Sequence, residues 1–215
     1  MGIYMGIDIG AVSINGVAGD EGGIILYEHP YLRHFGRVEE RCSEVLGAFF
    51  QRLNPEEIRS VSFTGNHGRK IAEAKGLFFE FESIAQIVGT LHVMPGVRSI
   101  ISMGGQDTAL YQIRYGNDSS WELEYFSTNG PCASGTGSFI DQQAQRLSVS
   151  MYEEKVSKDF EEIDKVLKDF IELGLKSQKP CNVACRCTVF TKSDMIHLQN
   201  KGERLEDIIY GLHLG

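Results

Sequence analysis

Residues 129–139 read NGPCASGTGSF, a loop of small residues with a cysteine, Cys132, in its middle. A loop of this kind that runs into a helix can present free backbone amides and the positive end of the helix dipole to an anion such as phosphate. The residues at that helix start are Gly135, Thr136 and Gly137. An ordinary helix start, capped by a hydroxyl of this loop, is the alternative. The loop is not a P-loop, because no Gly-Lys-Ser/Thr follows it.

Two acidic residues lie at the ends of apolar strands beside glycines: Asp8 in GIDIG and Asp107 in GGQD. A carboxylate at such a place can hold Mg²⁺ through water while glycine amides contact phosphate. Two plain turns are the alternative, since Asp and Gly both favour turns. The order of strand, Gly-Asp turn and second strand occurs in MGIDIGAVSINGVAG and again in SMGGQDTALYQIRYG. We interpret this as a weak internal duplication, which favours two related lobes that each present a glycine turn to a shared cleft.

Three of the five cysteines crowd into CNVACRC, residues 181–187. An odd number of cysteines in a chain with no export signal argues against a disulfide framework. The C-x3-C-x-C spacing of Cys181, Cys185 and Cys187 lacks a fourth ligand nearby, which Cys132 or a second chain could supply to zinc or an iron–sulfur cluster. Buried thiols are the alternative. Cys42 lies on the apolar face of a predicted helix and is expected to pack there.

Charge and hydropathy exclude several classes of protein. The formal net charge is −8 with no basic stripe, which argues against a general nucleic-acid surface. No run of about 18 apolar residues is present, so no membrane span is predicted. The N-terminal MGIYMGIDIG has the pattern of a strand and not of a signal peptide, and we expect a cytoplasmic protein.

Hydrophobic periodicity predicts the elements that must position these residues. Apolar runs bounded by glycines predict an antiparallel meander of three strands, followed later by another strand, a further strand before GGQD and a hairpin around Gly116-Asn117. The predicted strands are 3–10, 12–19, 22–32, 59–65, 98–105, 108–116 and 121–129. The predicted helices are 37–53, 67–76, 81–94, 137–147 and 157–177, with one or two more in 191–215.

The motifs GIDIG, GGQD, NGPCASGTGSF, CTVFTKSDMIHL and DIIYGLH, in this order, resemble the activator ATPases of 2-hydroxyacyl-CoA dehydratases and the ATPase subunits of benzoyl-CoA reductase. That family belongs to the actin-like superfamily of acetate and sugar kinases, heat-shock chaperones and actin. The resemblance covers most of the chain and implies an α/β fold of two ribonuclease-H-like lobes, 1–96 and 97–215. It also implies that the second lobe is truncated, because relatives continue into a glycine-rich segment that helps to grip adenosine.

The resemblance further implies a homodimer with a [4Fe–4S] cluster between the subunits, in which ATP hydrolysis drives an electron into a partner dehydratase or reductase. Its ligands here would be Cys132 and Cys187, with Cys181 and Cys185 as further candidates. The catalytic residues, serving Mg²⁺ and the attacking water, would be Asp8, Gln106 and Asp107. The implied contacts to ATP or ADP come from Gly10, Ser13, Gly104, Gly105, Gly135, Thr136 and Gly137. Neither nucleic acid nor membrane is an expected partner.

The chain also departs from the pattern of this family. Ala11, Val12 and Asn15 replace a polar turn and a lysine, and Thr108-Ala109 replaces a Ser-Lys pair. A third departure is Asn129-Gly130-Pro131, where an Asn-Asp-Lys sequence is usual before the loop cysteine. These departures remove contacts to phosphate and predict weak nucleotide binding or slow hydrolysis. Two alternatives therefore stay open: a small-molecule kinase of the same fold with Asp107 as base, and a non-catalytic nucleotide-fold module of a larger protein.

Overall fold

The computed structural model describes residues 2–118, 120–129, 137–152, 160–184 and 187–214. Packing divides the chain into two compact units. The first unit comprises the residues up to Gly105 together with Ala109–Ser127, and the second comprises Gln106–Thr108 together with the residues from Thr128 onward. These two units are defined by packing, whereas the lobes 1–96 and 97–215 were inferred from the family resemblance. The boundary between the lobes therefore stays a prediction.

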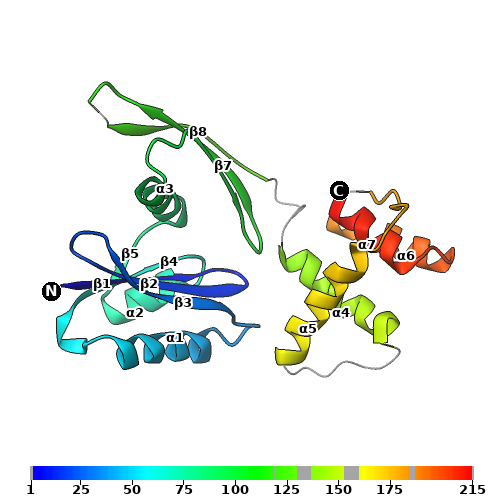
Figure 1. Ribbon diagram of the computed structural model, residues 1–215, viewed down its shortest axis with the longest axis horizontal. Coiled ribbons are helices and arrows are strands. Elements are labelled where there is room, and N and C mark those ends of the chain that lie inside the picture. The colour runs from blue at the N-terminus through cyan, green and yellow to red at the C-terminus, as the bar shows by residue number, and fades with distance from the viewer. Residues whose placement is uncertain (1, 119, 130–136, 153–159, 185–186, 215) are drawn as a thin grey trace. The chain divides into compact units, whose positions relative to one another are not determined.

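A five-stranded sheet forms the centre of the first unit (Figure 1). Its order is β3-β2-β1-β4-β5, in which β2 runs antiparallel to β1 and β3, β4 parallel to β1, and β5 parallel to β4. The predicted meander is confirmed, and the order agrees with the ribonuclease-H-like lobe of the expected fold. The strands are β1 (Ile3–Ile9), β2 (Ser13–Asp20), β3 (Ile25–Arg33), β4 (Ile58–Thr64) and β5 (Phe78–Phe79).

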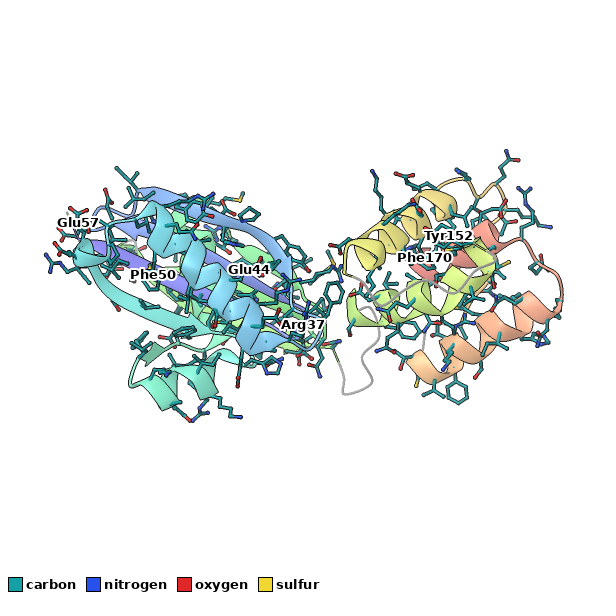
Figure 2. The ribbon with its side chains drawn as sticks, turned by 90° about the horizontal axis from the view of Figure 1, so that it is seen from below. Arg37, Glu44, Phe50, Glu57, Tyr152 and Phe170 are labelled. Carbon is teal, nitrogen blue, oxygen red and sulfur yellow. The ribbon has the colours of Figure 1, made fainter. Side chains whose placement is uncertain are left out.

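One face of this sheet is buried by two helices, α1 (Val38–Arg52) and α2 (Gly68–Lys75). Alternate residues of β1 are buried on that face, as the period of two in a strand requires: Ile3, Met5, Ile7 and Ile9. Helix α1 buries Cys42, Val45 and Phe49 against them, so the packing role predicted for Cys42 is confirmed. Figure 2 looks onto α1, whose outward side carries Glu44 and the exposed Phe50.

Helix α3 (Glu82–Val93) lies on the opposite side of the sheet from α1 (Figure 1). At its C-terminal end a ring nitrogen of His92 lies 2.9 Å from the carbonyl oxygen of Gly23 in the β2–β3 turn. The helix also receives a hydrogen bond from the Tyr111 hydroxyl to Gln86 Oε1, at 2.8 Å. That bond ties it to the second sheet of this unit, β6 (Ser99–Met103), β7 (Thr108–Tyr115) and β8 (Trp121–Thr128) in that order.

The second unit contains the helices α4 (Gly137–Tyr152), α5 (Phe160–Gly174), α6 (Thr188–Asn200) and α7 (Leu205–Leu214), whose apolar faces share one core. Phe170, labelled with Tyr152 in Figure 2, is fully buried in that core. Gly174 lets α5 and α7 approach closely, because a β-carbon on this residue would lie 2.7 Å from the side chain of Ile209. The helices predicted from periodicity are confirmed. No helix in the described part of the chain has the length and apolar character needed to cross a membrane.

Candidate functional site

Three polar side chains form a row across the open face of the five-stranded sheet. Asp8 on β1 pairs in register with Asn15 on β2 and with Thr64 on β4. Because residues directly opposite each other in paired strands point to the same face, these side chains lie on the face away from α1 and α2. They line an open groove of about 800 Å³, together with Glu82 and Gln86 of α3.

The carboxylate of Asp8 is the chemically distinctive member of this row. Its Oδ1 atom is buried and has no hydrogen-bond partner among the described residues. Burial raises the pKa of Asp8 above its usual value of 3.8, and a side-chain hydrogen bond with Asn15 acts in the opposite direction. A buried oxygen without a partner is costly unless a cation or a donor completes it. Carboxylate oxygens are the ligands that Mg²⁺ prefers, so this residue fits the predicted role toward a metal–nucleotide complex.

Gly65, directly after β4, makes room for that carboxylate. A β-carbon at this position would lie 2.4 Å from Asp8 Oδ1 and 2.5 Å from the Ile9 carbonyl oxygen. The residue also has a φ of 84°, in the left-handed region that glycine adopts readily. Thr64, the residue before it, has a buried hydroxyl with no hydrogen-bond partner among the described residues. Two unsatisfied oxygens therefore lie in one row beside a backbone position that tolerates only glycine.

The β1–β2 turn, where Gly10 and Ser13 were predicted to contact nucleotide, is closed by its own backbone. The N–H of Gly10 donates to the Ser13 carbonyl oxygen at 3.0 Å. The Gly10 N–H is therefore engaged within the turn, and the nucleotide contacts of Gly10 and Ser13 stay predictions. The turn is held from outside by two more bonds, from the His34 N–H to the Val12 carbonyl oxygen and from the His67 N–H to the Ile9 carbonyl oxygen, each at 3.0 Å.

The glycine pair after β6 reaches the same turn. A β-carbon on Gly105 would lie 2.2 Å from Val12 Cγ2, so a side chain at residue 105 would clash with the β1–β2 turn. Gly104 is exposed beside it. Gln106 and Asp107, the residues predicted to serve catalysis, are exposed and belong to the second unit.

Thr108 and Asn129 form a reciprocal pair of hydrogen bonds in the second unit. The Thr108 N–H donates to Asn129 Oδ1 at 3.0 Å, and the Asn129 N–H donates to the Thr108 carbonyl oxygen at 2.9 Å. Asn129 thus fixes the base of the β7–β8 hairpin at the residue where the small-residue loop begins. Gly137 is the first residue of α4, as the phosphate-loop prediction requires. Cys132, Gly135 and Thr136 lie outside the described residues.

The cysteine segment packs against α6 and α7. The Cys181 N–H donates to the Asp207 carbonyl oxygen at 2.9 Å, and the Thr191 hydroxyl lies 2.6 Å from the Ala184 carbonyl oxygen and 3.0 Å from that of Cys187. Cys187 is the N-cap residue of α6, with an extended backbone. Burial raises the pKa of the Cys181 thiol most, and the nearby acidic groups of Glu203 and Asp207 raise it further.

Cysteine binds a metal as the thiolate. The free amides and the dipole of a helix N-terminus favour this anion. Cys187 has this position, whereas Cys181 lies beside acidic residues that favour its neutral form. The surroundings of Cys187 and Cys181 thus differ, and the assignment of cluster ligands stays a prediction. Cys185, like Cys132, falls outside the described ranges. Within those ranges no group of three or more His, Cys, Asp or Glu side chains is arranged to hold a metal ion.

Sequence reasoning missed Thr64, Gly65 and His34. Thr64 and Gly65 are the last two residues of the predicted strand 59–65, and the alternating polar residues of RSVSFTG were the available signal. For His34, buried beneath the β1–β2 turn, the sequence held no signal, because the Gly10 carbonyl oxygen that its ring contacts lies 24 residues earlier in the chain.

The fold and these glycine turns define the class of protein: a mixed α/β chain with the actin-like ATPase fold. Two solved structures carry that assignment. The activator of the 2-hydroxyisocaproyl-CoA dehydratase from Clostridium difficile, with bound ADPNP, superposes with a TM-score of 0.69 at 27% identity, over 98% of this chain and 70% of that one. Component A of the (R)-2-hydroxyglutaryl-CoA dehydratase from Acidaminococcus fermentans gives a TM-score of 0.74 at 25% identity, over 99% and 74%.

The chain belongs to the BadF/BadG/BcrA/BcrD ATPase family, which it matches over residues 5–214. The (R)-2-hydroxyglutaryl-CoA dehydratase activating ATPase of A. fermentans is 30% identical, over 99% of this chain and 74% of the relative. The 2-hydroxyisocaproyl-CoA dehydratase activator of Clostridioides difficile is 28% identical over 97% and 70%. One component of the benzoyl-CoA reductase of Thauera aromatica is 24% identical over 100% and 70%. The family predicted from the motifs is therefore confirmed.

Proposed function

We propose that this protein is an ATP-dependent activator that passes an electron through a [4Fe–4S] cluster to a 2-hydroxyacyl-CoA dehydratase or a benzoyl-CoA reductase-like partner. The observation that carries the nucleotide part is the buried, unpartnered Asp8 oxygen in the row with Asn15 and Thr64. A relative of the same family binds ADPNP, which supports a nucleotide as the ligand. Two relatives are named as activators of 2-hydroxyacyl-CoA dehydratases, which supports the partner.

The residues of this chain have defined tasks in the proposal. Asp8 orients Mg²⁺ of the bound nucleotide, directly or through water, and Gly65 keeps the space that its carboxylate needs. Gln106 and Asp107 orient the attacking water, and phosphate contacts come from Ser13, Gly104 and Gly105 and from the loop 135–137. Because burial is costly for a lone carboxylate, the bound cation makes the Asp8 environment favourable.

Cys187 at the start of α6 and Cys132 would hold the cluster, two from each subunit of a homodimer. A cluster of this type supplies one-electron storage at a potential set by its ligands and surroundings. The chain itself anchors the Cys187 backbone through Thr191, so movement of α6 moves this ligand.

The test is anaerobic reconstitution with iron and sulfide, followed by measurement of iron content, absorbance and ATP-dependent reduction of a purified 2-hydroxyacyl-CoA dehydratase. We expect a brown protein whose colour and electron transfer are lost in Cys187→Ala. Cys181→Ala is the matched control, since the Cys181 thiol lies six residues before Cys187 and is expected to be dispensable for cluster binding. Colourless protein without bound iron would contradict the proposal for the cluster.

The nucleotide part is tested separately, by calorimetric titration with Mg²⁺–ADPNP. We expect binding by the wild-type protein and a loss of binding in Asp8→Asn. The exposed carboxylate of Glu56 offers a control, because Glu56→Gln removes a charge away from the row and is expected to leave binding unchanged. Absence of heat with both ADPNP and ADP would instead favour a non-catalytic module.

A further inference from the structure

The ring of His34 connects the β1–β2 turn to a second, strained turn. The ring Nε2 atom lies 3.1 Å from the Gly10 carbonyl oxygen, and the Gly36 N–H donates to the ring Nδ1 atom at 3.1 Å. Because Nδ1 accepts a hydrogen bond, it carries no proton, and Nε2 must be the protonated nitrogen that donates to Gly10. The contacts thus define one tautomer of a neutral imidazole.

The backbone around His34 adopts an unfavourable conformation that makes this arrangement possible. Phe35 has a φ of 47° and Gly36 a φ of 81°, and the Arg37 N–H donates to the His34 carbonyl oxygen at 2.8 Å. A bulky residue rarely adopts a positive φ, and such outliers persist where the surrounding contacts impose them. Here the strained turn directs the Gly36 N–H at the His34 ring. The strain therefore supports the ring in one orientation.

The surroundings of His34 favour the neutral ring. The side chain is buried, with 4% of the residue exposed. Burial lowers the pKa of His34 below 6.5, backbone hydrogen bonds with Gly10 and Ala11 oppose this, and the charge of His67 lowers it further. The two rings meet edge to face with centroids 5.8 Å apart. His67, at the start of α2, is the ionisable group that acts on His34 from the neighbouring elements among the described residues.

We propose that neutral His34 is a positioning residue for nucleotide binding: it holds the β1–β2 turn in place through Gly10 and Val12, and protonation of Nδ1 releases it. A protonated Nδ1 can no longer accept from Gly36, so the ring loses the contact that orients it toward Gly10. This inference rests on the proposed function, in which the same turn contacts the nucleotide. It adds a residue and a pH dependence that the proposed function does not require.

Two substitutions distinguish the hydrogen-bonding roles of the two ring nitrogens of His34. In His34→Gln the side-chain amide can place its nitrogen near the former Nε2 position and keep the bond to Gly10, with no group left to titrate. In His34→Asn the amide oxygen can replace Nδ1 as the acceptor for Gly36, and the bond to Gly10 is lost. At pH ~8 we expect His34→Gln to bind Mg²⁺–ADPNP within about 3-fold of wild type and His34→Asn to bind about 3- to 10-fold more weakly.

The pH profile gives the readout that a merely structural role would not change. As the pH falls below 6.5, the affinity of the wild type should fall more steeply than that of His34→Gln, because only the wild type has a ring at residue 34 that can gain a proton. Protonation of the nucleotide itself affects both proteins equally. His67→Gln removes the neighbouring charge, so His34 should gain its proton at higher pH and the loss of affinity should begin earlier. Identical profiles for wild type, His34→Gln and His67→Gln would overturn the proposal.

A measurement without nucleotide distinguishes failure of this inference from failure of the proposed function. Nitrogen chemical shifts of the His34 ring report its tautomer and its protonation directly, and amide exchange of residues 10–13 reports opening of the turn. We expect acid-linked opening in wild type and none in His34→Gln. Nucleotide binding that fails while this opening persists would contradict only the proposed function. Amide protection that is independent of pH in both proteins would contradict the inference.

Discussion

Gly65 faces Asp8 so closely that a β-carbon at residue 65 would lie 2.4 Å from a carboxylate oxygen of Asp8. Asp8 is the penultimate residue of β1 and Gly65 directly follows β4, and these two strands are paired in parallel. The space that a side chain would fill is therefore the space that the acidic group uses. The relationship makes a glycine at this position as important to the site as the carboxylate itself.

Gly65→Ala is expected to destabilise the protein by more than about 2 kcal/mol, since it adds a steric clash with the backbone of Ile9 to a strained positive φ. Gly76→Ala is the control: it has a positive φ of 65° but nothing within 4 Å, and should cost only about 1 kcal/mol. Urea unfolding measures both. Equal costs would show that the contact with Asp8 and Ile9 is of no consequence.

Asp8→Asn is expected to raise the free energy of unfolding at neutral pH while it weakens nucleotide binding. Burial raises the pKa of Asp8 in the folded protein, so the folded state binds this proton more tightly than the unfolded state. The carboxylate therefore reduces stability increasingly as the pH rises from 3.8, and the penalty is complete above the folded pKa. Thermal unfolding as a function of pH should show the gain of the variant disappearing in acid. A constant difference at all pH values would argue against a buried, ionised Asp8.

Thr64→Val should be stabilising by about 1 kcal/mol, because it removes a buried hydroxyl that has no partner among the described residues. Thr191→Val should have the opposite effect, a loss of about 1–3 kcal/mol, since that hydroxyl lies within hydrogen-bond distance of the Ala184 and Cys187 carbonyl oxygens. The same isosteric change is thus predicted to have opposite signs at two positions. Chemical denaturation of both variants measures the difference, and a loss of stability in Thr64→Val would show that the hydroxyl has a partner.

Gly211→Ala should separate α7 from the cysteine segment, because its β-carbon would lie 2.2 Å from the Cys181 carbonyl oxygen. We expect a loss of about 2–3 kcal/mol in the second unit, together with less reconstituted iron. Gly47→Ala in α1 has nothing within 4 Å and should stabilise its helix by about 0.5–1 kcal/mol. Unchanged stability and unchanged iron in Gly211→Ala would mean that the segment shifts without cost.

Most of the fold could be predicted from the sequence, because each long element has a strong local pattern. The alternation in IYMGIDI and the helical spacing of Val45 and Phe49 need no tertiary information. Strand β5 was not predicted, since its two residues, Phe78 and Phe79, are too few to show a period and become a strand only through pairing with β4. The long elements could thus be predicted from local sequence pattern, whereas the two-residue strand β5 depends on pairing with β4.

The candidate site was predicted less completely, for the same reason. Asp8 and the glycines around Gly105 could be found because acidic and glycine residues at strand ends form a visible motif. Thr64 and Gly65 enter the site only through the register of β1 with β4, which no local pattern specifies. His34 enters through a contact with a backbone carbonyl oxygen 24 residues earlier, and backbone groups look alike in every sequence.

The reciprocal hydrogen bonds between Thr108 and Asn129 have a mechanical consequence for the second unit. Thr108 follows Asp107 directly and Asn129 precedes Cys132 by three positions, so these two hydrogen bonds join the two segments. Under the proposed function, a displacement of Asp107 on phosphate release would reach the backbone of Asn129 across these two hydrogen bonds, without passing through any helix. Under the proposed function, Asn129→Ala, which removes the side-chain acceptor for the Thr108 N–H and keeps the backbone bond, is expected to weaken the coupling of nucleotide turnover to electron transfer.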